Sequence, residues 1–195
     1  MKRLLIIPTT CLFLASTAMA ANDNPHYMSL SYINSDMEYS GSDLSGSGVG
    51  LSGALALNSG LSLLAGFETV DFDSDLTARE YSFGAGYRME VLSGVTLGAR
   101  YKYLKTKLSG EGKSNASGNQ FAGELQVEIP DWMISFGKKR LVEAYAGQTQ
   151  YSNDDINEAG VGMRIYLTES FSFGASYGQE GDDRSDFQIF IREDR

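Results

Sequence analysis

The chain has 195 residues, with 16 Lys and Arg against 25 Asp and Glu, which gives a formal net charge of −9. This acidic balance argues against nucleic acid as a partner, because binding a phosphate backbone requires a surplus of Lys and Arg on one face. A single Cys and a single His exclude a disulfide scaffold and disfavour metal or catalytic sites that need several histidines. We therefore expect neither a cofactor nor a nucleic-acid partner.

The first twenty residues have the three parts of a secretory signal peptide. Lys2 and Arg3 form a basic start, a mostly apolar stretch follows, and Ala18-Met19-Ala20 has the small-x-small pattern of a cleavage site. The apolar stretch is shorter than the roughly 18 residues that a membrane-spanning helix needs. We predict a signal peptide over residues 1–20 and a single domain over 21–195. Cys11 would leave with the signal, and the mature chain would be exported.

From Ala21 onward, apolar and polar residues alternate with a period of two, which indicates β-strands. From Tyr81 to Met89, for example, every second residue is apolar, and Ser, Gly and Arg lie between them. Ten segments show this pattern: 27–35, 46–57, 60–71, 79–89, 94–106, 119–129, 140–151, 157–167, 170–180 and 185–192. Most are longer than the ~5–6 residues of a typical soluble strand and suit a tilted strand that crosses a bilayer, which takes about 9–11.

The connections between these segments favour a membrane barrel. The links after the second, fourth and eighth segments are short, at 58–59, 90–93 and 168–169, whereas the others at 36–45, 72–78, 107–118, 152–156 and 181–184 are longer and mostly acidic. Outer-membrane barrels have short periplasmic turns and longer extracellular loops. The sixth connection, 130–139, is a long periplasmic exception, and we place its Trp132 and Phe136 at the inner membrane interface.

The predicted fold is therefore all-β, a transmembrane antiparallel up-and-down barrel of about ten strands. An eight-stranded barrel without the first or the seventh segment is the alternative, since residues 141–145 do not choose a face clearly. In either barrel both termini would lie on the periplasmic side.

The two strand faces differ in charge. One face is apolar throughout and would meet lipid. The other, which we expect to be polar or small throughout, carries the charged residues of the strands. We predict a lumen charge network that consists of Glu68, Glu80, Arg88, Arg100, Lys102, Glu124, Glu128 and Arg164. Its acids and bases balance, which predicts a narrow lumen filled by ion pairs, because unpaired charges in such a space would be costly.

Other motifs carry less weight. Asp71, Asp73 and Asp75 have the alternate spacing of a calcium loop and are weak candidates for a divalent cation, but they lack the Gly and the distal Glu of an EF-hand. A solvated acidic loop is the simpler interpretation. Residues 48–53 spell the dinucleotide fingerprint, yet they lie inside a strand pattern rather than before a helix. His26, the only imidazole, lies at the predicted periplasmic edge, so we predict no enzyme activity.

A repeated pattern of an apolar residue followed by Gly and Ala, with Tyr two residues further on, occurs at 83–87, 97–101 and 173–177. With the signal peptide and the alternating strands, it makes the chain resemble the small outer-membrane β-barrel superfamily, which includes OmpA-like transmembrane domains and opacity-type surface proteins. The resemblance implies the outer membrane of a Gram-negative bacterium and insertion by the barrel-assembly machinery, which reads a terminal aromatic signal similar to 187–191. It carries over no catalytic residues.

We expect a monomeric protein with a structural or surface-interaction role, in contact with outer-membrane lipid and with lipopolysaccharide. Divalent cations could bridge the acidic loop tips to lipopolysaccharide phosphates. Two other functions stay open. One is a narrow porin-like channel for ions or small solutes, and the other is an exported lipocalin-like barrel with an apolar interior.

Overall fold

The computed structural model describes residues 26–39, 41–57, 60–73, 75–110, 114–134, 136–152, 154–182 and 184–194. The predicted signal peptide and Cys11 lie outside these residues. The strands are β1 (Tyr27–Tyr39), β2 (Ser42–Ala56), β3 (Leu61–Phe72), β4 (Leu76–Leu92), β5 (Val95–Ser109), β6 (Ser114–Glu128), β7 (Lys139–Tyr151), β8 (Asp155–Tyr166), β9 (Phe171–Glu180) and β10 (Arg184–Asp194). The all-β architecture of ten strands is confirmed, and the eight-stranded alternative is wrong.

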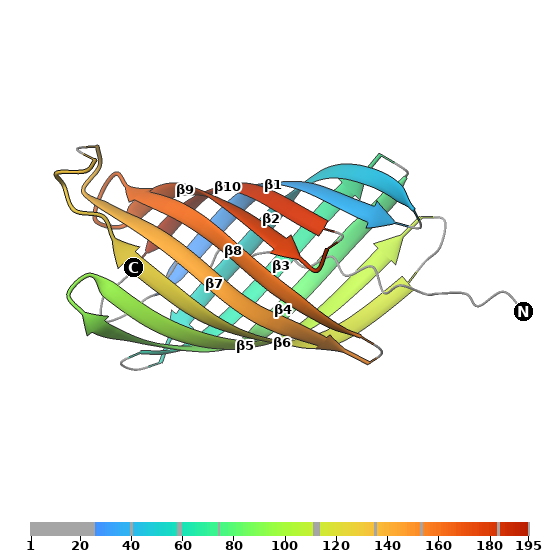
Figure 1. Ribbon diagram of the computed structural model, residues 1–195, viewed down its shortest axis with the longest axis horizontal. Helices are drawn as coiled ribbons and strands as arrows, with labels where there is room; N and C mark the ends of the chain where they lie inside the picture. Colours follow the sequence, from blue (N-terminus) through green and yellow to red (C-terminus); the bar gives the residue numbers. More distant parts are fainter. Residues whose placement is uncertain are drawn as a thin grey trace, which may run out of the picture.

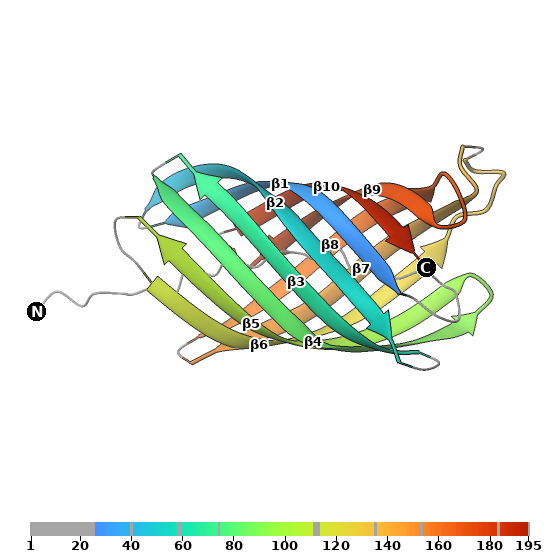
Figure 2. The same cartoon turned by 180° about the vertical axis from the view of Figure 1, so that it is seen from behind.

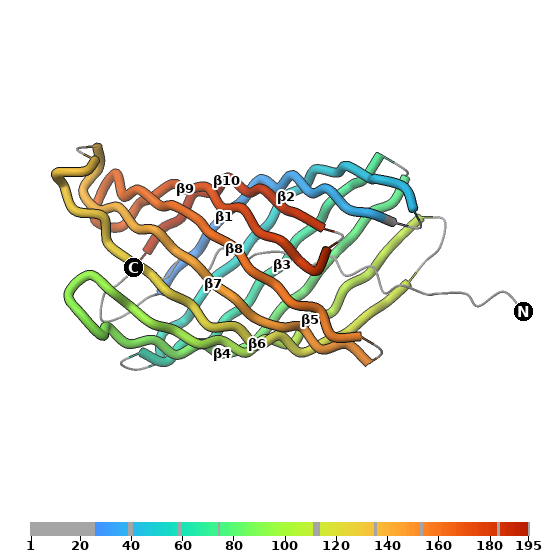
Figure 3. The backbone as a smooth tube through the Cα atoms, viewed as in Figure 1, coloured from blue at the N-terminus to red at the C-terminus, as the bar shows by residue number. Residues whose placement is uncertain are grey.

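Each strand pairs antiparallel with its neighbour in the chain, and β1 also pairs with β10. This last pairing runs from Tyr27 opposite Asp194 to Met37 opposite Arg184 and closes the sheet into a barrel. Closure leaves no unpaired strand edge. The strands tilt across an elongated barrel when it is seen from either side (Figures 1 and 2), and the backbone trace in Figure 3 shows β1 lying beside β2 and β10.

No helix among the described residues is long and apolar enough to cross a membrane.

The barrel has two distinct ends. We call the end where β1 begins and β10 ends the terminal end, and the other the opposite end. The connections at the opposite end cover only residues 40–41, 73–75, 110–113, 152–154 and 181–183, whereas the longest connection, 129–138, lies at the terminal end. The prediction of longer loops at the opposite end is therefore wrong, because the strands themselves continue into those segments.

Two strands differ from their predicted limits in ways that matter for the lumen. The seventh segment, which seemed ambiguous in sequence, forms a full strand from Lys139 to Tyr151. The last strand continues beyond the predicted Arg192 to Asp194, with Arg192 and Asp194 buried inside the barrel and Glu193 between them partly exposed. The prediction stopped at Arg192 because charged residues cannot face lipid. Arg192 and Asp194 instead face the lumen, so the strand continues with its polar side inward.

The outer wall carries an apolar belt. Two charged residues lie at its edge near the terminal end: Glu193 between Met28 and Phe171, and Arg140 opposite Ile165. On β4 the belt runs from Tyr81 to Met89, about 26 Å along the strand and about 20 Å along the axis at a tilt of about 40°, close to the ~25 Å band of outer-membrane barrels. We define the apolar belt by its larger members: Met28, Leu30, Tyr32, Val49, Leu51, Leu55, Leu61, Leu63, Phe67, Tyr81, Phe83, Tyr87, Met89, Leu97, Tyr101, Tyr103, Phe121, Leu125, Val127, Val142, Val161, Met163, Ile165, Phe171, Phe173, Tyr177, Phe187, Ile189 and Ile191.

Toward the opposite end the polarity of the two faces reverses. We call this part the extension: residues 34–39, 42–48, 69–72, 76–80, 104–109, 114–120, 148–151, 155–158, 178–180 and 184–186. Its outward side chains are polar or charged, such as Asp36, Asp71, Lys105, Asn119 and Gln150, while many of its inward ones are apolar. The extension therefore has the pattern of a barrel wall in water.

Candidate functional site

The inward side chains form three layers along the lumen. An apolar layer lies in the extension, an acidic layer lies where the extension meets the belt, and a layer rich in arginine lies in the half nearer the terminal end. Side chains in all three layers are largely buried, with Arg164 and Gln188 at 0% exposure and Leu104 at 1%. Strands distant in sequence contribute to each layer, because the tilt of the strands brings different positions to the same level.

In the arginine layer, one carboxylate holds two guanidinium groups. Glu124 on β6 lies 2.7 Å from Nη1 of Arg100 on β5 and 3.2 Å from Nη2 of Arg88 on β4. Arg100 also lies over the ring of Tyr145, with its Cζ atom 5.0 Å from the ring centroid. Buried charges require such pairing, because each ion loses its hydration when the barrel closes.

A second group in this layer joins β7 and β8 to the last strand. Arg164 donates to Glu143 at 2.8 Å and lies 3.9 Å from the Asp194 carboxylate. Asp194 also accepts hydrogen bonds from Arg192 and, at 2.9 Å, from the Tyr166 hydroxyl. Arg192 covers the Tyr27 ring of β1 at 3.6 Å. This group therefore links the first and last strands of the barrel at the terminal end.

The acidic layer contains more carboxylates than cations. Its carboxylates are Glu68, Glu80, Glu158, Glu180 and Asp186, and its cations are Lys102 and Arg184, all less than 9% exposed. Asp186 binds Arg184 at 2.9 Å, and Glu80 accepts from the Thr106 hydroxyl at 3.1 Å. Gln120 donates to Glu158 at 2.8 Å. Carboxylates outnumber cations in the acidic layer, and arginines dominate the arginine layer. Positive and negative charges are therefore unevenly distributed along the lumen.

The apolar layer lies in the lumen toward the opposite end. One cluster contains Ile33, Met37, Val70, Phe72, Leu76, Ala78 and Leu108, with Leu44 packed against it, and another contains Leu104 and Tyr151, with Ala116 and Ile156 against it. The expectation of a polar or small inner face throughout is therefore wrong. Successive residues of a strand point to opposite faces. Because the outward residues of the extension are polar, its apolar residues point inward.

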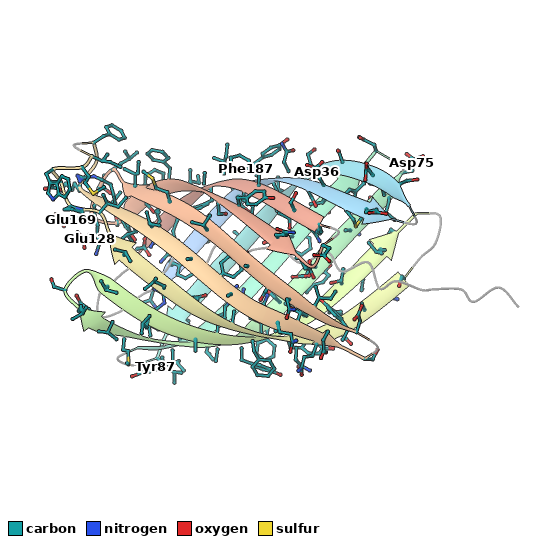
Figure 4. All side chains as sticks on the ribbon, in the orientation of Figure 1. Asp36, Asp75, Tyr87, Glu128, Glu169 and Phe187 are labelled. Carbon is teal, nitrogen blue, oxygen red and sulfur yellow. The ribbon has the colours of Figure 1, made fainter. Side chains whose placement is uncertain are left out.

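The structure brings most of the predicted network residues into the lumen. Glu68, Glu80 and Lys102 lie in the acidic layer, and Arg88, Arg100, Glu124 and Arg164 lie in the arginine layer. Glu128 has the inward parity but lies at the end of β6, where its half-exposed carboxylate is 3.4 Å from Lys139. Figure 4 shows it at the terminal end with Glu169. Glu128 is the last residue of β6 and therefore lies at the rim of the barrel.

Sequence reasoning missed a comparable number of buried charges: Glu143, Glu158, Glu180, Arg184, Asp186, Arg192 and Asp194. Glu143 lies in the strand whose face was ambiguous, and most of the others lie near predicted segment ends. A simple signal could have found them. Applying the period-two parity of each strand to the polar residues at its ends and just beyond them places all of these residues except Glu143 on the inner face.

The other candidate motifs lie in a turn, before the first strand or inside a strand. Asp71 accepts a hydrogen bond from Thr77 at 2.7 Å, Asp73 and Asp75 lie in the adjoining turn, and the described residues contain no group of three His, Cys, Asp or Glu side chains that could hold a metal ion. His26 accepts a hydrogen bond from the Ala56 backbone N–H at 3.3 Å. Residues 48–53 lie wholly within β2.

The connection 129–138 lies against the outer wall at the terminal end. Arg140 points outward from β7 but is only 2% exposed, because it binds Asp131 at 2.7 Å and donates to the backbone carbonyls of Phe136 and Gly137 at 2.8 Å each. The Phe136 ring contacts Phe173 of the apolar belt, with centroids 6.5 Å apart. Trp132, at 82% exposure, extends from this connection. Arg140 therefore fixes an aromatic loop beside the belt.

Comparison with known proteins identifies the fold. No family model and no curated protein matches this sequence. The β domain of the Bordetella autotransporter BrkA is similar in structure, with a TM-score of 0.52 and 13% identity over 88% of this chain and 99% of that chain. Neisserial surface protein A (TM-score 0.46, 12% identity, 87% of this chain and 97% of that chain) and the KdgM porin (0.47, 12%, 87% and 98%) are more distant. The chain thus has the fold of outer-membrane β-barrels.

Proposed function

We propose that this protein is an outer-membrane β-barrel with a closed, charge-filled lumen that acts as a structural or surface-interaction protein rather than as an open pore. The observation that carries the proposal is the burial of inward side chains at every level of the lumen, from Leu104 in the apolar layer to Arg192 near the terminal end, each 1% exposed. A continuous water path along these side chains would leave them accessible. The proposal includes no catalytic step.

Membrane insertion is supported by the apolar belt. Phe83 is 67% exposed and Tyr32 is 51% exposed, on a wall where large apolar side chains follow one another around the barrel. A monomeric soluble protein rarely exposes a continuous apolar surface of this kind. The terminal end would face the periplasm and the extension would project outward, as in barrels whose termini are periplasmic.

Two measurements test location and lumen separately. Cell fractionation with the heat-modifiable gel shift of folded barrels tests insertion, and recovery as a water-soluble protein would contradict it. Recording from planar bilayers tests whether the lumen conducts ions. An established porin, recorded separately in a bilayer of the same lipid, is the positive control. We expect no steady conductance from the folded barrel, and a steady single-channel current would overturn the closed-lumen proposal.

A narrow cation channel is the second candidate. It is favoured by Glu180, which is 8% exposed, and whose two carboxylate oxygens have no hydrogen-bond partner among the described residues. Its carboxylate lies 3.9 Å from Arg184. Steady conductance with a reversal potential that favours cations would support this candidate. The lipocalin-like alternative is opposed by the charged inner layers and the apolar outer belt, which are the reverse of a soluble ligand-binding barrel.

A further inference from the structure

Three cationic side chains lie together on the outer wall of the extension. Arg79 on β4 is directly opposite Lys107 on β5, and Lys105 is opposite Tyr81 one step closer to the belt. All three cations are exposed. We call Arg79, Lys105 and Lys107 the basic patch.

No ion pair joins the basic patch to any carboxylate of the described residues. Like charges directly opposite each other on a sheet destabilise the pair. The Tyr81 ring lies 5.9 Å from Nζ of Lys107. Asp71 on the next strand accepts its hydrogen bond from Thr77 instead. The patch therefore holds uncompensated positive charge, which an anion from outside would stabilise.

The basic patch is unusual in its surroundings. Elsewhere the charged outward positions of the extension are acidic, as at Asp36, Glu38, Asp43 and Asp155. Figure 4 shows Asp36 toward the same end of the barrel. In the part of the chain that the structure describes, the other cations lie in the lumen or at the terminal end. The outer wall of the extension thus concentrates its positive charge on β4 and β5.

The patch also borders the apolar belt directly. Tyr81 and Tyr103 are the first belt residues on β4 and β5, and the neighbouring strand β6 places Asn115 opposite Lys107 and Ser117 opposite Lys105. A ligand here would meet cations and polar side chains at one level and aromatic rings at the next. Such an arrangement fits an amphipathic molecule with anionic groups at the membrane surface and hydrocarbon chains beside the belt.

We propose that the basic patch binds the phosphate groups of lipid A, the membrane anchor of lipopolysaccharide, in the outer leaflet. This rests on the proposed outer-membrane location and on the outward orientation of the extension. Arg79 can donate two parallel hydrogen bonds to one phosphate, and the two lysines supply mobile point charges. Acyl chains would lie along Tyr81, Phe83 and Tyr103. Direct cation contacts would bind the phosphates without a bridging divalent ion.

The test is a titration of the folded barrel in detergent micelles with diphosphorylated lipid A, in the presence of a chelator. The variant Arg79→Gln with Lys105→Gln and Lys107→Gln removes the patch charge, and Lys138→Gln, an exposed lysine at the terminal end, is the matched control. We expect the triple variant to bind at least about tenfold more weakly, because three charge-assisted contacts are lost, and the control to stay within about twofold of the native protein.

Unchanged lipid A binding by the triple variant would overturn the proposal. Equally tight binding of dephosphorylated lipid A would also overturn it, and so would equally tight binding of inorganic phosphate, which would identify a free anion as the ligand. The gel shift confirms that each variant is folded before titration. Because the titration uses folded protein in micelles, its failure is distinct from a failure of the fractionation experiment.

Discussion

The belt and the extension are built from the same ten strands but have opposite polarity. In the belt, Phe83 and Tyr101 point outward while Arg88 and Arg100 point inward. In the extension, Arg79 and Lys107 point outward while Ala78 and Leu108 point inward. The alternation itself does not change along a strand, so the difference indicates where the surroundings of the outer wall change from hydrocarbon to water.

The two regions also fill the lumen by different means. In the belt half, ion pairs and hydrogen bonds join inward arginines, carboxylates and tyrosines, whereas in the extension inward apolar side chains pack against one another. The acidic layer lies between them. Substitutions should therefore have different consequences in the two regions, and the following predictions run from the largest expected effect to the smallest.

The largest effect is expected for Arg164→Ala in the arginine layer. The change leaves Glu143 and Asp194 buried without the cation that lies 2.8 Å and 3.9 Å from them. Breaking a buried pair in this way costs about 3–5 kcal/mol. The free energy of unfolding, measured by urea titration in lipid or detergent, should fall by this amount. A loss below about 1 kcal/mol would show that the belt half does not depend on this pairing.

A similar but more variable effect is expected for Leu104→Ala in the apolar layer. Leu104 is 1% exposed and packs with Tyr151, so the change removes buried apolar surface and leaves a cavity. The expected loss of unfolding free energy is roughly 2–5 kcal/mol. Outward Lys105, the next residue, gives the control variant Lys105→Ala, which should change stability little. Equal losses for the two variants would contradict an apolar core in the extension.

A lysine on the outer wall should distinguish the two regions directly. Ala99→Lys introduces a charge in the middle of the belt on β5, and we expect a loss of about 2–4 kcal/mol in a lipid bilayer. Ser47→Lys places the same charge on the exposed outer wall of the extension, where about 0–1 kcal/mol is expected. Refolding in vesicles followed by urea titration measures both. If Ala99→Lys is as mild as Ser47→Lys, the belt does not contact hydrocarbon.

The smallest effect is expected at the terminal rim. Lys138 and Glu169 form a pair 3.2 Å apart, but their side chains are 59% and 91% exposed. Solvent screening reduces such a pair to less than about 1 kcal/mol. Lys138→Ala should leave the midpoint of urea unfolding nearly unchanged. Added salt should not alter the small difference between the variant and the native protein. A large loss would mean that this rim is buried against lipid or another molecule.

Much of the fold could be predicted from the period-two pattern. The ten strands, their order and the predicted lumen positions of Glu68, Arg100 and Arg164 all follow from parity within single strands. The predicted strand limits are wrong where the outer wall is polar, because we assumed that the outward face of every strand is apolar. Asp36 and Lys107 were assigned to loops because a lipid-facing strand cannot carry them outward, yet both lie in strands of the extension. Asp194 points inward and was missed because the predicted last segment stopped at residue 192, before the strand ends.

The partners of the lumen charges could not be predicted in this way. Glu124 meets Arg88 and Arg100 from two different strands, and Arg164 on β8 meets Asp194 on β10 with β9 between them. Which charges share a level depends on the register of all ten strand pairs and on the tilt that closure imposes. The folding of residues 129–138 onto the outer wall around Arg140 likewise depends on tertiary contacts.

The sequence by itself determined the architecture and the two faces of each strand, because alternation is a local property with a fixed period. Its single His and single Cys also led us to expect no catalytic or metal site, and this stays a prediction. Only the tertiary structure decided how the lumen charges pair, where the polarity of the wall reverses, and that Arg79, Lys105 and Lys107 share one surface. These features depend on the alignment of neighbouring strands, which closure of the barrel sets.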